Sequence, residues 1–347
     1  MMAKPSLKTV AEACGYGVST VSYVLRGKAA EMNIPERTQD RILATAKELG
    51  YRRNRIGAAL STGKTGFVAL ISGAYGHPWR ESRQALAATQ LTDLGYHVHQ
   101  FDTHWDAGSP GRMVGEVLSL RPDGILVSDV TDSTRTEILD RIAESGIPTV
   151  GLDYLEDDRF GYVYLDRVAA GRLPTEHLLE LGHRELSFVM PTSRARGQSF
   201  YLTQRLEGFH QALAAAGIAP APEQLLWHET GPSLSLLEAG YGSYEQLQAA
   251  QRSALIFTND LMVLGFMKAC HERGVSIPEN LSVVGSEDLA VCRYLPVPPT
   301  TLSFPIAAMV ERAVAMLRAA LDGEATAQVR EGFAPTLIVR DSTCPIH

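Results

Sequence analysis

Basic side chains are concentrated at the start of this 347-residue chain. Residues 1–62 contain ten Lys or Arg and five Asp or Glu, a net charge of +5, although the whole chain carries −7. The remaining residues therefore carry −12. Guanidinium and ammonium groups gathered in one segment can bind a polyanion such as the phosphate backbone of a nucleic acid. The alternative is that these charges form an ordinary solvated face.

The elements that would present these charges are short helices. Apolar side chains at three- and four-residue spacing predict one helix over about 7–14 and another from about 18 to 25. Ser6 can cap the first helix, and Gly15 can end it with a positive φ. Two short helices joined by a tight glycine turn are typical of a helix-turn-helix, whose second helix enters a DNA major groove. A helical hairpin inside a protein core shares this pattern.

After this headpiece the pattern changes to α/β. A third helix starts at Pro35 and is stopped by Gly50, and residues 51–66 then form a linker. The strands expected after the linker are 67–71, 96–101, 124–127, 149–152, 162–165, 186–190, 254–258 and 281–285. Apolar strands that alternate with helices indicate parallel sheets covered on both faces. These units are too many for one compact sheet, so we expect two lobes and a ligand in the cleft between them, at the carboxyl ends of strands.

Several other classes of protein are disfavoured. No run of 18 apolar residues could span a membrane, and no apolar stretch before the first helix resembles a secretory signal. The four cysteines are scattered, which suits reduced thiols, so we expect a cytoplasmic protein. His97 and His99 would share one strand face near Asp102, but solvation at a strand end explains them better than a metal does. No nucleophile elbow, P-loop or zinc-protease motif occurs, so we expect no catalytic residues, no metal and no cofactor.

The order and spacing of several motifs resemble the LacI/GalR family of bacterial transcription regulators along nearly the whole chain. In the headpiece and linker they are Val10-Ala-Glu, Thr20-Val21-Ser22 and Leu49-Gly-Tyr-x-x-Asn54. In the core they are Pro122-Asp-Gly-Ile125, Thr175-Glu-His-Leu-x-x-Leu-Gly-His183, Arg205-Leu-x-Gly-Phe209, Asn259-Asp260, Pro278-x-x-Leu-Ser-Val-Val-Gly285 and Pro299-Thr-Thr301. Together they are far more specific than any one motif.

The resemblance implies a domain organisation and a quaternary state. It implies a headpiece, a hinge helix and a two-lobed core that is similar to a periplasmic sugar-binding protein and forms a homodimer. The expected ranges are 1–53 for the headpiece, 54–65 for the hinge and linker, and 66–341 for the core, with a first lobe of about 66–167 and 302–330 and a second lobe of about 168–301 and 331–341.

The resemblance also implies which headpiece residues contact double-stranded DNA at a palindromic operator. The residues at base-reading positions are Val18, Ser19 and Tyr23, which can meet a thymine methyl or the polar edges of bases. The residues at phosphate-contacting positions, which fix register without specifying sequence, are Thr20, Ser22, Asn33, Thr38 and Tyr51. Gly17 stands where the family usually has a serine.

The hinge and the effector site follow from the same resemblance. Asn54, Arg55, Gly57 and Leu60 would form the hinge, where the leucine wedges a minor-groove base step open and Gly57 replaces a usual alanine. The effector, most simply a sugar, would meet Arg205, which matches the hydroxyl-clamping arginine of the family, and Glu287, where an aspartate is usual. The other residues expected at this site are Trp79, Ser128, Asp153, Asn259 and Asp260. Packing, capping and loop roles remain open for Trp79, Asp260 and Asp153.

The function implied is a sequence-specific DNA-binding regulator, which we interpret as a repressor controlled by a small carbohydrate. The competing hypothesis is an α/β sugar-binding protein or sugar-acting enzyme with an incidental helical head. The basic headpiece and the lack of a secretion signal count against it.

Overall fold

The structure is a computed structural model that describes residues 5–51, 63–73, 77–102, 110–130, 135–192, 200–229, 235–250 and 252–346. The chain divides into two compact units, Met1–Thr65 and Gly66–His347. None of the helices in the described ranges combines the length and the apolar character that a membrane crossing requires.

The first unit is a small helical headpiece. Helices α1 (Leu7–Cys14), α2 (Val18–Leu25) and α3 (Glu36–Glu48) pack around a core that includes Val10, Val21 and Ile42. The Ser6 hydroxyl accepts a hydrogen bond from the Thr9 amide, and Gly15 follows α1 with a φ of 77°. The predicted bounds of the first two helices are therefore confirmed. The headpiece folds from local signals because caps and periodic apolar residues agree.

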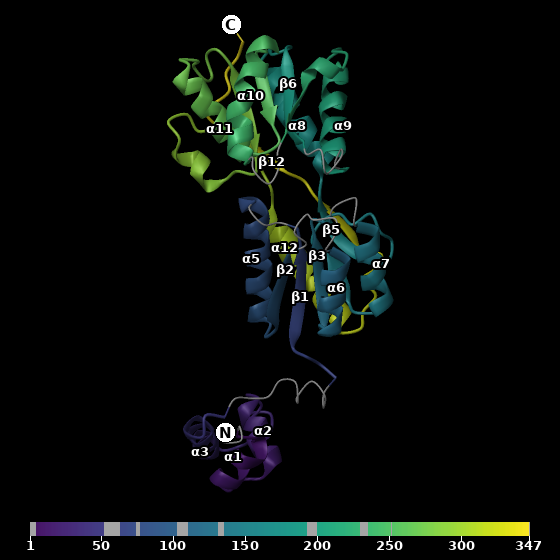
Figure 1. The fold of residues 1–347 in the computed structure, drawn as a ribbon, viewed down its shortest axis with the longest axis vertical. Helices are drawn as coiled ribbons and strands as arrows, with labels where there is room; N and C mark the ends of the chain where they lie inside the picture. Colours follow the sequence, from purple (N-terminus) through teal and green to yellow (C-terminus); the bar gives the residue numbers. More distant parts are fainter. Residues whose placement is uncertain are drawn as a thin grey trace. The chain divides into compact units, whose positions relative to one another are not determined.

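The second unit contains two lobes, each built on a six-stranded sheet (Figure 1). The first lobe has the strand order β11-β5-β4-β3-β1-β2, and all its neighbouring strands are parallel. Its strands are β1 (Phe67–Ser72), β2 (His97–Asp102), β3 (Gly124–Ser128), β4 (Thr149–Gly151), β5 (Gly161–Leu165) and β11 (Arg330–Phe333). Helices α5 (Pro78–Asp93) and α12 (Ile306–Leu321) cover one face, and α6 (Pro110–Ser119) and α7 (Arg135–Ser145) cover the other (Figure 1).

The second lobe repeats this layered arrangement with the strand order β12-β10-β9-β8-β6-β7. Its strands are β6 (Leu186–Thr192), β7 (Leu225–Glu229), β8 (Ala254–Phe257), β9 (Ser282–Ser286), β10 (Thr300–Ser303) and β12 (Thr336–Ile338). Only β12 runs antiparallel to its described neighbour. Helices α8 (Arg167–Glu180) and α9 (Phe200–Ala215) cover one face, and α10 (Leu236–Ala250) and α11 (Asp260–Glu272) the other. Two 3-10 turns, Pro222–Gln224 and Ala290–Tyr294, complete the described helices.

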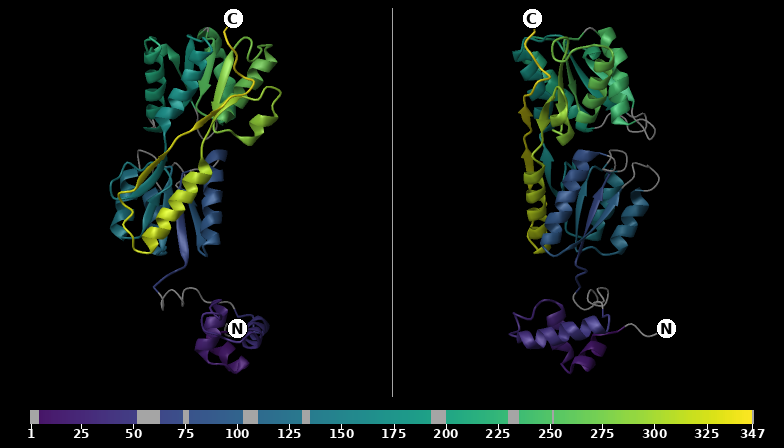
Figure 2. Two further views of the ribbon diagram at one scale, coloured as in Figure 1. Left: turned by 180° about the vertical axis from the view of Figure 1, so that it is seen from behind. Right: turned by 90° about the vertical axis from the view of Figure 1, so that its left-hand side faces the viewer.

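The chain passes between the lobes three times, after β5, after β10 and after β11 (Figure 2). Two of the expected crossing points were wrong by a few residues. Leu302 and Ser303 still pair with β12 in the second lobe, so the return to the first lobe comes after 303 rather than before 302. Residues 331–333 pair with β5, so the final crossing comes after 333 rather than before 331. Long-range strand pairing, which local sequence does not display, sets both points.

Glycines allow two helix pairs in the second lobe to approach closely. A Cβ atom on Gly171 of α8 would lie 1.8 Å from the Arg205 carbonyl oxygen of α9, and one on Gly208 would lie 1.9 Å from the Val168 carbonyl oxygen. Helices α10 and α11 approach each other just as closely, since a Cβ atom on Gly265 would lie 1.9 Å from the Leu237 carbonyl oxygen. Only glycine fits such backbone-to-backbone contacts, and the first pair fixes where α9 carries Arg205.

Candidate functional site

The headpiece presents one polar face of α2. Val18, at 45% exposure, and Ser19 are exposed, whereas Thr20, Ser22 and Tyr23 are half-buried. Val21 and Val24 point into the core. Positions 19, 22, 23 and 26 follow the i, i+3, i+4, i+7 spacing of one helical face. The predicted base-reading positions 19 and 23 therefore share a face with the predicted phosphate contact Ser22.

Arg26 belongs to this face and was missed in the sequence. Its Nε atom donates to the Ser22 carbonyl oxygen at 3.2 Å, another guanidinium nitrogen donates to the Ser22 hydroxyl, and its Cζ atom lies 5.4 Å from the centroid of the Tyr23 ring. The side chain is exposed. The seven-residue interval from Ser19 is the signal that could have identified it.

The other predicted DNA contacts lie on different parts of the headpiece. Asn33 is exposed with a φ of 50°, Thr38 is half-buried near the start of α3, and Tyr51 packs against the headpiece core. The predicted hinge residues Asn54, Arg55, Gly57 and Leu60 lie outside the described residues. These roles stay predictions.

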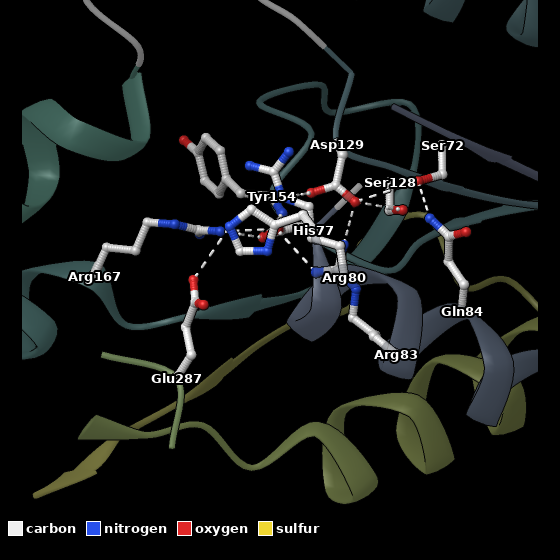
Figure 3. A network of polar contacts seen from close by, with 11 residues as sticks. Ser72, His77, Arg80, Arg83, Gln84, Ser128, Asp129, Tyr154, Arg167 and Glu287 are labelled. Atoms are coloured by element: carbon white, nitrogen blue, oxygen red, sulfur yellow. Dashed lines mark hydrogen bonds and ion pairs between the residues drawn. The ribbon is translucent and has the colours of Figure 1, made fainter. Parts of the chain in front are cut away.

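A network of charged and polar side chains joins the two lobes of the core (Figure 3). We call it the inter-lobe cluster, and its members are His77, Arg80, Arg83, Asp129, Asp153, Arg167, Arg205 and Glu287. The first five come from the first lobe, and Arg167, Arg205 and Glu287 come from α8, α9 and the loop after β9.

Asp129 lies immediately after β3 and binds two arginines of α5. Its carboxylate is 3.3 Å from the Arg80 Nε atom and also contacts the fully buried Arg83 guanidinium. Ser128, an expected effector residue, donates its hydroxyl to Asp129 at 3.0 Å. Burial alone would raise the Asp129 pKa, but the charges of Arg83 and Arg80 outweigh it and hold this pKa well below its usual range. Asp129 is therefore ionised.

Asp153, an expected effector residue after β4, links the same network to the second lobe. Its carboxylate lies 3.2 Å from Arg83 and 2.7 Å from Arg167 at the start of α8. The Arg167 guanidinium also lies 4.1 Å from the centroid of the Tyr201 ring on α9. Each of these buried carboxylates therefore has two guanidinium partners, an arrangement that offsets the cost of removing charge from water.

Arg205 lies in the same region but has a different environment. Within the described residues, a guanidinium nitrogen donates to the Thr258 carbonyl oxygen at 2.6 Å, and the Cζ atom is 5.6 Å from the Phe304 ring centroid. It is buried. Burial, followed by repulsion from Arg167, lowers the Arg205 pKa to about 10. At neutral pH it is a buried cation with no carboxylate within ion-pair distance among the described residues.

Glu287 reaches from the second lobe to His77 at the start of α5, with 3.4 Å between Oε1 and Nε2 (Figure 3). Burial and the charge of Asp260 raise the Glu287 pKa well above its usual value. Burial, followed by the charge of Arg80, lowers the His77 pKa to about 3. This contact therefore joins a neutral imidazole to a carboxyl group that tends to hold its proton. Glu287 also has a φ of 107°, a strained backbone typical of functional sites.

Three other expected effector residues have structural contacts. Asn259 caps α11 by accepting a hydrogen bond from the Met262 amide. Asp260 accepts hydrogen bonds from the Thr301 hydroxyl and the Leu289 amide, both at 2.8 Å, and burial raises its pKa to about 6. Trp79 is buried, with Arg83 over its ring at 4.6 Å and the Phe304 ring centroid at 5.4 Å. The contacts of Trp79 support its packing role, whereas Asn259 caps α11, and Asp260, for which that role was left open, does not.

Buried polar atoms without a hydrogen-bond partner gather at the cluster. Eight such side-chain atoms occur in the described parts of the chain. Five belong to the cluster or to residues that touch it: His77 Nδ1, Trp79 Nε1, Arg83 Nε, Thr258 Oγ1 and Glu287 Oε2. Buried polar groups are rarely left without partners in folded proteins, so this concentration indicates a place where a polar ligand binds.

Sequence reasoning identified Asp153, Arg205 and Glu287 but missed His77, Arg80, Arg83, Asp129 and Arg167. Asp129 and Arg167 closely follow the strands β3 and β5, a position that had already drawn attention to Ser128. The α5 arginines gave no comparable signal, because an arginine on a helix is most often exposed.

No group of three or more His, Cys, Asp or Glu side chains is arranged to hold a metal ion in the described ranges, which include His97, His99 and Asp102. All four cysteines are free thiols.

Comparison with known proteins identifies both units. Residues 6–54 match the model of "Bacterial regulatory proteins, lacI family", and residues 175–343 match a periplasmic binding protein-like domain. The transcriptional regulator AscG of Escherichia coli strain K12 is 29% identical, over 96% of each chain.

Two solved structures are similar over nearly the full length. The CelR–cellobiose complex is 25% identical, with a TM-score of 0.69 over 97% of this chain and 99% of that one. The lac repressor dimer bound to operator and an anti-inducer is 22% identical, with a TM-score of 0.81 over 99% and 100%, and it shows the same fold. The chain therefore combines a DNA-binding domain of the bacterial lacI regulatory family with a periplasmic binding protein-like domain, and its curated relatives are transcriptional regulators.

Proposed function

We propose that this protein represses transcription by binding a palindromic operator as a homodimer, and that a carbohydrate bound at the inter-lobe cluster changes its affinity for that operator. The observation that carries the proposal is the occurrence in one chain of a polar helix-turn-helix face and a buried, incompletely paired polar cluster between two lobes. A regulator that acts on chromosomal DNA works in the cytoplasm.

The DNA-binding part of the proposal is assigned to α2. Val18, Ser19 and Tyr23 read bases, while Thr20, Ser22, Asn33, Thr38 and Tyr51 contact phosphates. We add Arg26 to the DNA-facing set, because it shares a face with Ser19 and Tyr23 and carries a charge that none of them has. An arginine on that face can contact a phosphate or a guanine edge.

The effector part is assigned to Arg205, Glu287 and His77. Arg205 is a buried cation without an ion-pair partner among the described residues, and Glu287 Oε2 and His77 Nδ1 are buried atoms without a hydrogen-bond partner. Asp153 and Ser128 support them through their contacts with arginines and with Asp129. The CelR structure is a complex with cellobiose, which supports a carbohydrate as the ligand of this chain. Because Glu287 and His77 come from different lobes, a ligand that contacts both would favour one lobe arrangement. A ligand shifts the DNA equilibrium only through its different affinities for the two arrangements.

The experiment starts with selection of operator sequences from a random DNA pool by the full-length protein. Tyr23→Ala is then measured on the selected operator, and we expect a loss of about 1–3 kcal/mol concentrated at one base-pair position in each half-site. Glu311→Ala, at an exposed position of α12, is the control. A selection that yields no preferred sequence would refute the regulator, and an unchanged Tyr23→Ala profile would refute the assignment of this reader.

The enzyme hypothesis makes a different prediction. AscG and CelR are transcriptional regulators rather than sugar-acting enzymes. An enzyme would convert a bound sugar, so prolonged incubation of the protein with any carbohydrate that stabilises it should leave that carbohydrate chemically unchanged. Turnover would favour the alternative.

A further inference from the structure

We propose that the effector is an acidic carbohydrate, whose carboxylate or phosphate group is bound by the Arg205 guanidinium. This inference rests on the proposed function and names the chemical class of ligand for the same site. Its basis is how charge is paired within the inter-lobe cluster.

The cluster contains more guanidinium groups than its ionised carboxylates require. Arg80 and Arg83 bind Asp129, and Arg83 and Arg167 bind Asp153. Three arginines thus already share two carboxylates. Arg205 is a fourth, which Arg167 and Arg80 repel and Glu287 and Asp153 attract, and it has no carboxylate within ion-pair distance among the described residues. A further cation so placed is stabilised when an anion arrives with the ligand.

Glu287 attracts Arg205 but forms no ion pair with it among the described residues. Its described ion-pair partner is His77 at 3.4 Å, and its Oε2 atom is buried without a hydrogen-bond partner. Burial and the nearby Asp260 charge raise its pKa, against the opposing charges of Arg205 and Arg80, which disfavours the carboxylate form. The Asp260 carboxylate already accepts hydrogen bonds from the Thr301 hydroxyl and the Leu289 amide, and Gly285 packs directly against it.

The contacts of the Arg205 guanidinium suit the binding of an anion. One guanidinium nitrogen donates to the Thr258 carbonyl oxygen, and the Phe304 ring lies near the guanidinium. Among the described residues, these contacts use one guanidinium nitrogen as a hydrogen-bond donor. A guanidinium binds carboxylate and phosphate oxygens through two parallel hydrogen bonds, and it binds a neutral hydroxyl less strongly. The Glu287 Oε2 atom, which is buried without a hydrogen-bond partner, would bind a further polar group of the same ligand.

The test compares matched pairs of acidic and neutral carbohydrates on the full-length protein. The pairs are glucuronate with glucose, galacturonate with galactose, cellobionate with cellobiose, and ribose 5-phosphate with ribose, all at equal ionic strength set with sodium chloride. Melting shifts locate a binding pair, and isothermal titration gives its dissociation constants. We expect at least one acid to bind at least tenfold more tightly than its neutral partner. Comparing the carboxylate pairs with the phosphate pair shows which acidic group the protein binds.

Three variants test where the anion binds. Arg205→Gln should remove most of the preference for the acid, whereas Arg205→Lys should keep part of it because the charge remains. Glu287→Gln imitates the protonated acid and should keep the preference within about threefold, since one charge-assisted bond is not lost. Melting curves without ligand show that each variant is folded.

Some results would overturn the inference. Neutral sugars that bind as tightly as their acids would refute it while leaving the carbohydrate-regulated repressor intact. Binding by no acid in the panel would refute it as well. A protein that selects no operator would instead refute the proposed function, so the two failures are distinguishable.

Discussion

The His77–Glu287 contact predicts an unusual loss of stability in mild acid. His77 is half-buried beside the α5 arginines and Glu287, and burial, followed by the charge of Arg80, lowers its pKa from 6.5 to about 3. In the unfolded chain the imidazole takes up a proton as the pH falls through 6.5, whereas in the folded protein it stays neutral until about pH 3. The unfolded state therefore binds more protons between these values, and the free energy of unfolding falls as the pH falls across this window.

The size of the effect follows from the two pKa values. Between pH 7.5 and pH 5.0 this single group should cost about 2 kcal/mol of unfolding free energy. The assay is urea unfolding followed by circular dichroism at both pH values, for the wild type and for His77→Gln, which cannot titrate. The carboxyl groups of Glu287 and Asp260 titrate in both proteins, so the difference between the two pH dependences isolates His77.

We expect the wild type to lose about 2 kcal/mol more than His77→Gln on acidification. His97→Gln, an exposed change on the edge strand β2, controls for the substitution itself. Equal pH dependence in the wild type and His77→Gln would show that the imidazole is not held neutral, and would refute the description of this contact.

Three further predictions concern a helix contact, operator binding and buried charge. Gly171→Ala should separate α8 from α9 and lower the unfolding free energy by about 1–3 kcal/mol, and effector affinity should fall at least tenfold because Arg205 moves. Arg26→Ala should weaken operator binding and reduce the slope of log affinity against log salt by about one, if the guanidinium binds a phosphate. Arg83→Met should destabilise the core by about 3–5 kcal/mol in urea unfolding, because two buried carboxylates each lose a partner.

Controls for these predictions come from the same chain. Gly265→Ala produces an equivalent clash between α10 and α11, so it should lower stability without affecting effector affinity, and equal effects of both glycine variants on binding would refute the link to Arg205. Arg41→Ala removes another exposed arginine that lies near an aromatic ring, on α3, and should change the salt slope less than Arg26→Ala. A stability loss below 1 kcal/mol for Arg83→Met would contradict the paired-charge description.

The sequence predicted those parts of the fold that depend on neighbouring residues. Ser6, Gly15 and the periodic apolar residues between them set α1 locally, and its bounds were correct. The strands β1 and β3 were recognised because a run of buried apolar residues is visible without knowing its partners. The crossings after β10 and β11 were misplaced because pairing with distant strands decides them.

The site was predicted only in part for a similar reason. Arg205 and Glu287 stood out through resemblance, and Asp153 through its place at a strand end. Arg83 gave no such signal, since its two acidic partners lie 46 and 70 residues away and only folding brings them to α5. Residues that act as counter-ions are seldom visible in one sequence, because their meaning depends on what they are paired with.

The three crossings between lobes have a consequence for how the protein is made. The headpiece is a local structure that is complete after about fifty residues have left the ribosome, whereas neither lobe is a continuous segment. The first lobe lacks its edge strand until β11 emerges, and the second lacks β12 and the Ser342 hydroxyl, which donates to the Val283 carbonyl oxygen of β9. During synthesis the DNA-binding unit therefore exists before the unit that would control it, and a ribosome that stalls late yields a headpiece without regulation.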